Sequence, residues 1–153
     1  MTPYKEIQIF KHLLVAIDGS DLSDTAYRKA IALASSIQAR LTAIQVVAHY
    51  DVMRLQTAML QETRQRFMQE AYRQAEAYLA TIVQEAAAAG VPCEIACPTG
   101  DHIFQAIVDE AEARKCDLIV MASHGRRGMQ ALVIGSETQK VLTHTKIPVL
   151  VYR

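Results

Sequence analysis

Five short apolar runs, separated by segments with helical periodicity, are the feature that most constrains how this chain folds. The runs lie at residues 12–18, 41–47, 91–97, 117–122 and 148–152. Most are rich in β-branched residues, and three are continuously apolar, which is typical of strands buried on both faces. Because strands and helices alternate along the whole chain, the sequence predicts an α/β fold with a parallel sheet and helices on both faces.

Helix signals occupy the four segments between these runs, at residues 20–37, 57–89, 101–111 and 136–142. Ser20 and Asp21 offer an N-cap to the first segment. The second is rich in Ala, Gln and Glu, and Gly90 after it is a natural C-cap. Residues 48–63 leave two interpretations open, a loop over a pocket or the first turns of the long helix.

The charge balance narrows the classes of function. Sixteen Lys and Arg residues are offset by 16 Asp and Glu residues, so the formal net charge is zero. A general nucleic-acid binder or a polybasic membrane-surface protein needs a surplus of cations. The chain has no run of 18 apolar residues, and its first eleven residues lack the apolar stretch of a signal peptide. We therefore expect one domain over residues 1–153, cytoplasmic, with no membrane segment and with nucleic acid disfavoured as a partner.

The three cysteines, Cys93, Cys97 and Cys116, do not form a disulfide framework, since their number is odd. Cys93 and Cys97 are four residues apart, but they lie in an expected strand and no second ligand pair accompanies them. A metal site is therefore not expected. Reduced, mostly buried thiols are the better interpretation.

The stretch from Ala122 to Gly128, followed by Gly135-Ser136, carries the strongest functional signal. A strand that leads into small residues, and then Gly-Ser opening a helix, aims backbone N–H groups at phosphates. Ser136 can donate its hydroxyl group to a phosphate, or it can serve only as a helix cap. Asp18 ends the first strand, where a carboxylate can bind a nucleoside, help to hold Mg²⁺ or cap a turn. Ligands of open parallel sheets bind at such strand ends.

Motifs of the common nucleotide-binding and hydrolytic enzymes are absent. The chain has no G-x-G-x-x-G after its first strand, no P-loop and no G-x-S-x-G elbow, and no Ser/His/Asp or Cys/His set can be assembled from it. We therefore assign no catalytic residue. Gly125-Arg126-Arg127-Gly128 matches the G-x-x-G of RNA-binding KH domains, but it follows a strand rather than lying between two helices. His124 beside it can contact a phosphate or bond to the backbone.

Several segments resemble one known family, and the likeness covers nearly the whole chain. The first strand ends in Asp18-Gly19-Ser20, and Gly125 is followed by nine residues and then by Gly135-Ser136. The ATP-binding branch of the universal stress proteins has a similar pattern: Gly, two residues, Gly, nine residues, then Gly and Ser or Thr. Ala122 stands where that motif has its first Gly. A methyl group is the smallest replacement, so we expect weaker binding rather than none.

The resemblance implies a Rossmann-like fold with an open five-stranded parallel sheet in the order 3-2-1-4-5. It implies that ATP binds over the ends of the first and fourth strands, where a Mg²⁺ ion can accompany the phosphates. Asp18 and Val46 would contact the nucleoside. The ribose and phosphates would be held by Ala122, Gly125, Gly135 and Ser136. Family members commonly form homodimers through the last strand, here Pro148–Tyr152.

Three hypotheses follow. The first is a stress-response protein that binds an adenine nucleotide for sensing or regulation, without dedicated catalysis. The second is a dimeric family member that has lost nucleotide binding and acts through protein–protein contacts, which Ala122 motivates. The third is RNA binding through Gly125–Gly128, against which the neutral composition weighs.

Overall fold

The computed structural model describes residues 9–49, 61–125 and 133–153. Its strands are β1 (His12–Ala16), β2 (Arg40–Ile44), β3 (Val47–Ala48), β4 (Cys93–Ala96), β5 (Thr99–Gly100), β6 (Leu118–Ala122) and β7 (Val149–Tyr152). Its helices are α1 (Asp21–Ile37), α3 (Gln61–Ala88), α4 (Ile103–Ala113) and α5 (Ser136–His144). All five expected strands are present, each shorter than the apolar run that predicted it.

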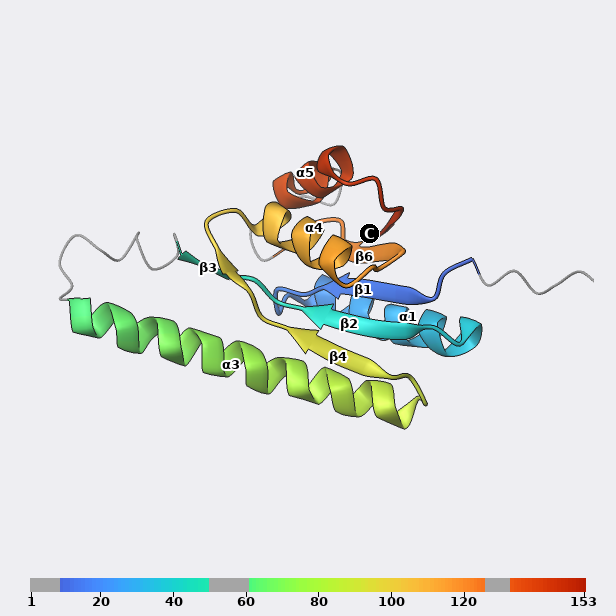
Figure 1. Cartoon of the computed structure of the whole chain (residues 1–153), viewed down its shortest axis with the longest axis horizontal. Helices are drawn as coiled ribbons and strands as arrows, with labels where there is room; N and C mark the ends of the chain where they lie inside the picture. Colours follow the sequence, from blue (N-terminus) through green and yellow to red (C-terminus); the bar gives the residue numbers. More distant parts are fainter. Residues whose placement is uncertain (1–8, 50–60, 126–132) are drawn as a thin grey trace, which may run out of the picture.

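Five strands form one parallel sheet in the order β4-β2-β1-β6-β7 (Figure 1). Counted along these five strands, the order is the expected 3-2-1-4-5. Strand β1 lies at the centre, where Leu13 is in register with Leu41 of β2 on one side and with Leu118 of β6 on the other. The carboxyl ends of all five strands therefore point toward the same edge of the sheet.

A second, two-stranded parallel sheet of β3 and β5 was not expected. The sequence predicts one strand over residues 41–47, yet β2 ends at Ile44 and β3 starts at Val47. On the neighbouring chain segment, Pro98 separates β4 from β5. Proline has no N–H to donate to a ladder, so it interrupts regular pairing, although its carbonyl oxygen still accepts from Val47 N at 2.9 Å.

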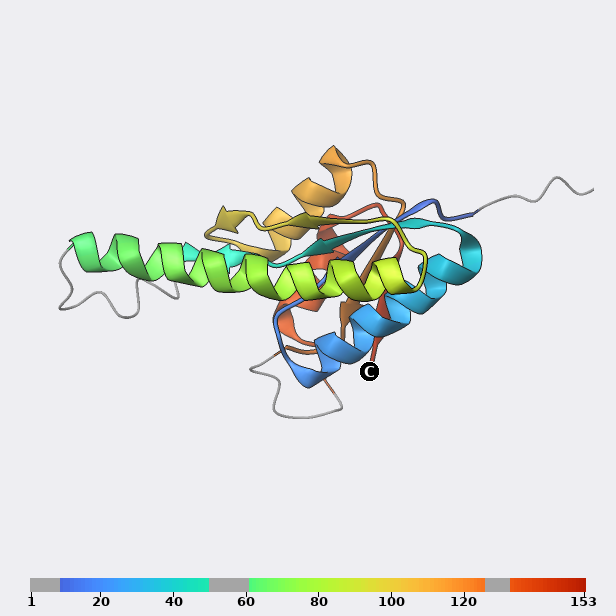
Figure 2. The ribbon, with the colours of Figure 1, turned by 90° about the horizontal axis from the view of Figure 1, so that it is seen from below.

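Two layers of helices cover the sheet, α1 and α3 on one face and α4 and α5 on the other (Figure 2). Successive strand residues alternate between the two layers, as the pleat of a strand requires. Leu13 and Val15 pack with the α1/α3 layer, while Leu14 packs with the α4/α5 layer. Helix α3 has 28 residues, and its first turns project well past the sheet (Figures 1 and 2).

The helix ends agree with most of the sequence signals. The Ser20 hydroxyl caps α1 by accepting from Ser23 N at 3.2 Å. Gly90 follows α3 with φ +73°, a conformation that glycine adopts without strain. For the segment 48–63, which the sequence left open between a loop and a helix, residues 61–63 belong to α3 and favour the helix at that end. Residues 50–60 lie outside the described residues.

All three cysteine thiols are free. Cys116 is buried and the other two are half-buried. Burial raises the pKa of Cys93 and of Cys116 to about 11, so both stay protonated at neutral pH. In the part of the chain that is described, no three metal-binding side chains converge, and no helix has the length and apolar character to cross a membrane.

Candidate functional site

The ends of β1 and β6 meet at Asp18 and Gly125. These strands are neighbours in the sheet, and each runs on into a loop at the same edge. A Cβ atom on Gly125 would collide with Oδ2 of Asp18 and would lie 3.3 Å from its Cγ. Glycine is thus required at position 125 because the Asp18 carboxylate fills the space that a side chain would need.

A tight turn holds Asp18 in this position. Its Oδ1 accepts from Ser20 N at 3.0 Å and from Ser20 Oγ at 2.6 Å, and its own N–H donates to Ser23 Oγ at 3.3 Å. Gly19 completes the turn with φ +76°. The turn-capping role expected as one alternative for Asp18 is therefore present, and the carboxylate also reaches Gly125.

Gly135 brings the start of α5 to the end of β6. Its N–H donates to the carbonyl oxygen of Ser123 at 2.6 Å. A Cβ atom on Gly135 would lie 3.2 Å from both that oxygen and His124 Cα. Gly135 itself occupies the N-cap position with φ −60°, and Ser136 is the first residue of the helix. The interpretation of Ser136 as the cap is therefore wrong, because the chain enters the helix one residue earlier.

Ala122 is the last residue of β6 and is only 8% exposed. Its carbonyl oxygen accepts from Thr138 Oγ1, in the first turn of α5, at 3.0 Å.

Val46 follows β2 at the same edge of the sheet, is half-buried, and packs against the α4/α5 layer. The backbone bond from Ile17 N to Ile44 O, 2.9 Å long, holds the ends of β1 and β2 together.

The structure thus gathers Asp18, Gly125, Gly135 and Ser136 around the ends of β1 and β6, with Ala122 beneath α5. Val46 lies at the end of the next strand. Residues 126–128 of the G-x-x-G tetrapeptide lie outside the described residues. His124 lies with Nδ1 3.1 Å from Ser123 Oγ, a side-chain partner that was neither of the two alternatives considered for it, a phosphate or the backbone.

Three residues that shape this site had no role assigned to them in it from the sequence. Ser20 was recognised only as a helix cap, yet it also fixes the Asp18 carboxylate. Ser123 receives the Gly135 N–H through its backbone carbonyl, which no side-chain pattern reveals. Thr138 is buried inside the first turn of α5, and only the folded chain shows that its hydroxyl reaches Ala122.

The chemistry of this edge suits an anion. The first N–H groups of α5 have no carbonyl partner within the helix, and they carry the positive end of its dipole. They begin at Ser136, next to two glycines that leave the backbone uncovered. The Asp18 carboxylate lies beside Gly125 and suits a group with hydrogen-bond donors, such as a ribose or a base.

A family model described as "Universal stress protein family" matches residues 9–153. The chain belongs to the universal stress protein family. A universal stress protein of Thermus aquaticus is 34% identical over 149 residues, covering 95% of this chain and all of that protein. Universal stress protein YxiE of Bacillus subtilis is 30% identical over 149 residues, with the same coverage of both chains.

Solved universal stress proteins share the fold. UspA from Lactobacillus plantarum superposes with a TM-score of 0.81 at 23% identity, over 94% of this chain and 98% of that one. A universal stress protein solved with cAMP gives a TM-score of 0.64 at 23% identity, over 95% and 98%. One from Archaeoglobus fulgidus solved with dAMP gives 0.65 at 16% identity, over 95% and 99%.

Proposed function

We propose that this universal stress protein binds an adenine nucleotide, ATP above all, at the ends of β1 and β6, for sensing or regulation rather than catalysis. The observation that carries the proposal is the convergence of Asp18, Gly125 and Gly135. Each of the two glycines faces neighbouring atoms so closely that a side chain would have to displace them. Two structural neighbours in the same family hold cAMP and dAMP, which supports the choice of an adenine ligand.

Asp18 and Val46 would contact the nucleoside, while Ala122, Gly125, Gly135 and Ser136 would hold the ribose and phosphates. One buried polar atom in the residue after β2 also calls for a partner. Gln45 Oε1 is buried and has no hydrogen-bond partner among the described residues. A buried acceptor of this kind is rare unless a water or ligand satisfies it.

Magnesium would be held mainly by the phosphate oxygens, with the Asp18 carboxylate beside Gly125 as a further ligand. The described residues gather no three-ligand metal cluster, so the ion would arrive with the nucleotide. The sequence offers no recognisable general base for this site, and we expect any hydrolysis of ATP to be slow.

The test of the site is Gly135→Val, measured by calorimetric titration of nucleotide-stripped protein with ATP, with and without Mg²⁺. The valine side chain must push against Ser123 O and His124 Cα, both 3.2 Å from its Cβ. We expect binding to weaken by more than about tenfold.

Gly100→Val is the matched control, because a Cβ atom on Gly100 meets nothing within 4 Å. This variant should bind ATP as the parent does, and circular dichroism should show that both variants stay folded. Equal affinity in the parent and in a folded Gly135→Val variant would remove the proposed site.

A second candidate function, protein–protein contact without nucleotide, is favoured by Ala122 alone. Its test is Ala122→Gly. If the parent binds ATP, the glycine should tighten binding by no more than a few-fold, since Ala122 is already nearly buried beneath α5. If only the glycine variant binds ATP, the second function replaces the first.

We also propose a homodimer formed through β7. This strand is an edge of the five-stranded sheet, and Leu150 on it is 36% exposed. An edge strand with an exposed apolar side chain favours pairing with another chain.

A further inference from the structure

Helix α4 begins without a cap of its own. Its N-cap residue, His102, makes no side-chain hydrogen bond to the helix. The N–H of Phe104, in the first turn, instead donates to Oε2 of Glu137 at 2.9 Å. Glu137 belongs to α5, so the start of α4 is capped by a neighbouring helix.

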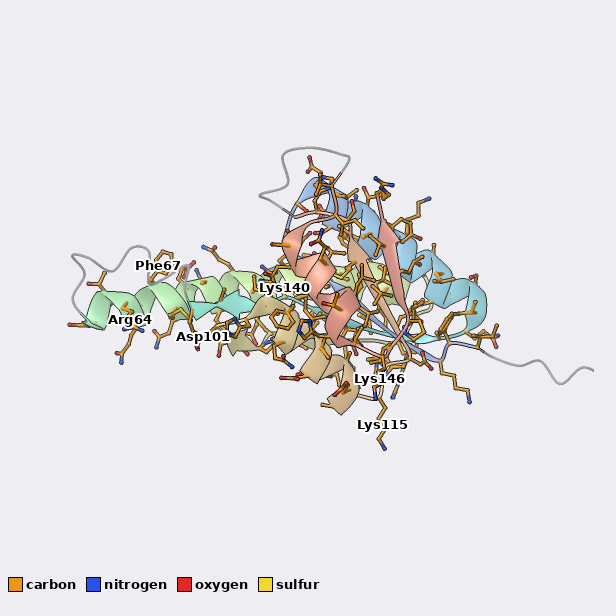
Figure 3. All side chains as sticks on the ribbon, turned by 90° about the horizontal axis from the view of Figure 1, so that it is seen from above. Arg64, Phe67, Asp101, Lys115, Lys140 and Lys146 are labelled. Carbon is orange, nitrogen blue, oxygen red and sulfur yellow. The ribbon has the colours of Figure 1, made fainter. Side chains whose placement is uncertain are left out.

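The other oxygen of the same carboxylate is also engaged. Oε1 of Glu137 lies 3.1 Å from Nζ of Lys140, one turn further along α5. Figure 3 shows Lys140 on α5 where this helix runs beside α4. The charge of Glu137 is thus shared between the dipole of α4 and an ammonium group, both of which stabilise a carboxylate.

The ring of Phe104 forms the rest of this contact. Lys140 Nζ lies 5.6 Å from its centroid, and the His144 ring lies 4.8 Å away at 46°. Glu137, Lys140 and His144 are spaced by three and four residues, so they share one face of α5. We refer to Phe104, Glu137, Lys140 and His144 as the α4–α5 contact.

The position of Glu137 on α5 links this contact to the candidate site. It lies between Ser136, which is expected to touch phosphate, and Thr138, which bonds to the end of β6. The first turn of α5 is therefore attached on two sides, to β6 through Gly135 and Thr138 and to α4 through Glu137.

We propose that Glu137 is a positioning residue for the phosphates of the bound nucleotide. By capping α4 it fixes the direction in which the first N–H groups of α5 point. The same contact directs the negative charge of the Glu137 carboxylate toward Phe104 N and Lys140. This inference rests on the proposed function and names a residue outside the set expected from the sequence.

Three variants separate positioning from simple charge. Glu137→Ala removes both bonds of the carboxylate. Glu137→Gln keeps an amide oxygen that can accept from Phe104 N but loses the charge. Lys140→Met removes the ion pair and leaves the cap. If Glu137 positions α5, ATP should bind about five- to tenfold more weakly to Glu137→Ala than to the parent. The affinity of Glu137→Gln and of Lys140→Met for ATP should lie within about twofold of the parent's or be higher.

The experiment is titration of each variant with ATP and with adenosine. Because the inference concerns the phosphates, Glu137→Ala should leave adenosine affinity unchanged. Tighter ATP binding by Glu137→Ala, equal binding, or an equal loss of ATP and adenosine would each overturn the inference while leaving the proposed function in place. A parent that binds neither ligand would overturn both.

If adenosine alone binds too weakly to measure, amide hydrogen exchange provides the second readout. Exchange in the first turn of α5 should be faster in Glu137→Ala than in Glu137→Gln, while the strands keep the protection of the parent. Equal exchange in the two variants would overturn the inference.

Discussion

At the scale of single residues, four of the described glycines serve two different purposes. Gly19 and Gly90 adopt positive φ values of 76° and 73°, which most side chains would strain. Gly125 and Gly135 are needed for space instead, since neighbouring atoms stand where their side chains would be. Gly19 shapes the turn that holds Asp18, whereas Gly125 and Gly135 mark the site by their close neighbours. The letter G in a sequence does not distinguish the two kinds.

His12 lies in a buried polar cluster at the opposite end of β1. It is 4% exposed, and its Nε2 lies 2.8 Å from Thr42 Oγ1 while Nδ1 lies 3.2 Å from the Arg114 carbonyl oxygen. Burial is the main cause that lowers the pKa of His12, and Arg40 adds to it. The Arg114 carbonyl, Glu94 and Asp117 act in the opposite direction.

The lowered pKa of His12 predicts a loss of stability in acid. The unfolded chain takes up the proton near pH 6.5 and the folded chain only at lower pH. Above pH 6.5 the His12 ring is neutral in both states, so its titration should leave the free energy of unfolding unchanged there. This free energy should fall as the pH drops below 6.5, and level off below the pKa of the folded state. Urea unfolding from pH 8 to pH 5 measures this.

His12→Gln is the comparison, since glutamine does not titrate. Its unfolding free energy should change less than that of the parent between pH 7 and pH 5. Parallel curves for the two proteins would show that His12 does not contribute to the pH dependence.

At the scale of elements, helix α1 depends on the residue before it. Ser20 Oγ both caps the helix at Ser23 N and donates to Asp18. Ser20→Ala should lower the free energy of unfolding by about 1 kcal/mol, the usual cost of losing an N-cap. It should also weaken ATP binding, because the Asp18 carboxylate loses one of its donors.

Ser36→Ala is the control for this change. Ser36 is exposed on the same helix, and its hydroxyl donates to the Leu33 carbonyl one turn back. Its stability in urea and its affinity for ATP should match those of the parent. A Ser20→Ala variant that behaves like Ser36→Ala would contradict the role assigned to Ser20.

Most elements could be predicted because their signals are local. Periodicity and the caps at Ser20 and Gly90 are properties of neighbouring residues, whereas the strand order came from the family resemblance. The break between β2 and β3 depends on Pro98, more than fifty residues away. The cap of α4 depends on Glu137 in a similar way. Asp18, Gly125 and Gly135 stand out in the sequence. Ser123 contributes through its backbone carbonyl and Thr138 through its hydroxyl group, and only the fold brings these atoms to their partners.

At the scale of the whole molecule, the proposed homodimer predicts the effect of a charge on β7. Leu150→Lys places an ammonium group on the exposed side chain of the edge strand. Burying an ammonium charge that has no opposite charge beside it is costly, so the dimer should dissociate to monomers in sedimentation velocity.

Phe67→Lys is the control, because Phe67 is 43% exposed on the projecting end of α3 (Figure 3). A dimer lost in both variants or in neither would argue against pairing through β7.

The central place of β1 also determines when the candidate site can form during synthesis. Strand β1 pairs with residues 40–44 on one side, but its other neighbours are residues 118–120, which leave the ribosome much later. Until then one edge of β1 has no strand to pair with, and Asp18 has no Gly125 to face. Parallel pairing over such sequence separations is slow and leaves nascent chains open to aggregation. The proposed nucleotide site is therefore incomplete until β6 has been synthesised, and a truncated product that ends before β6 should not bind nucleotide.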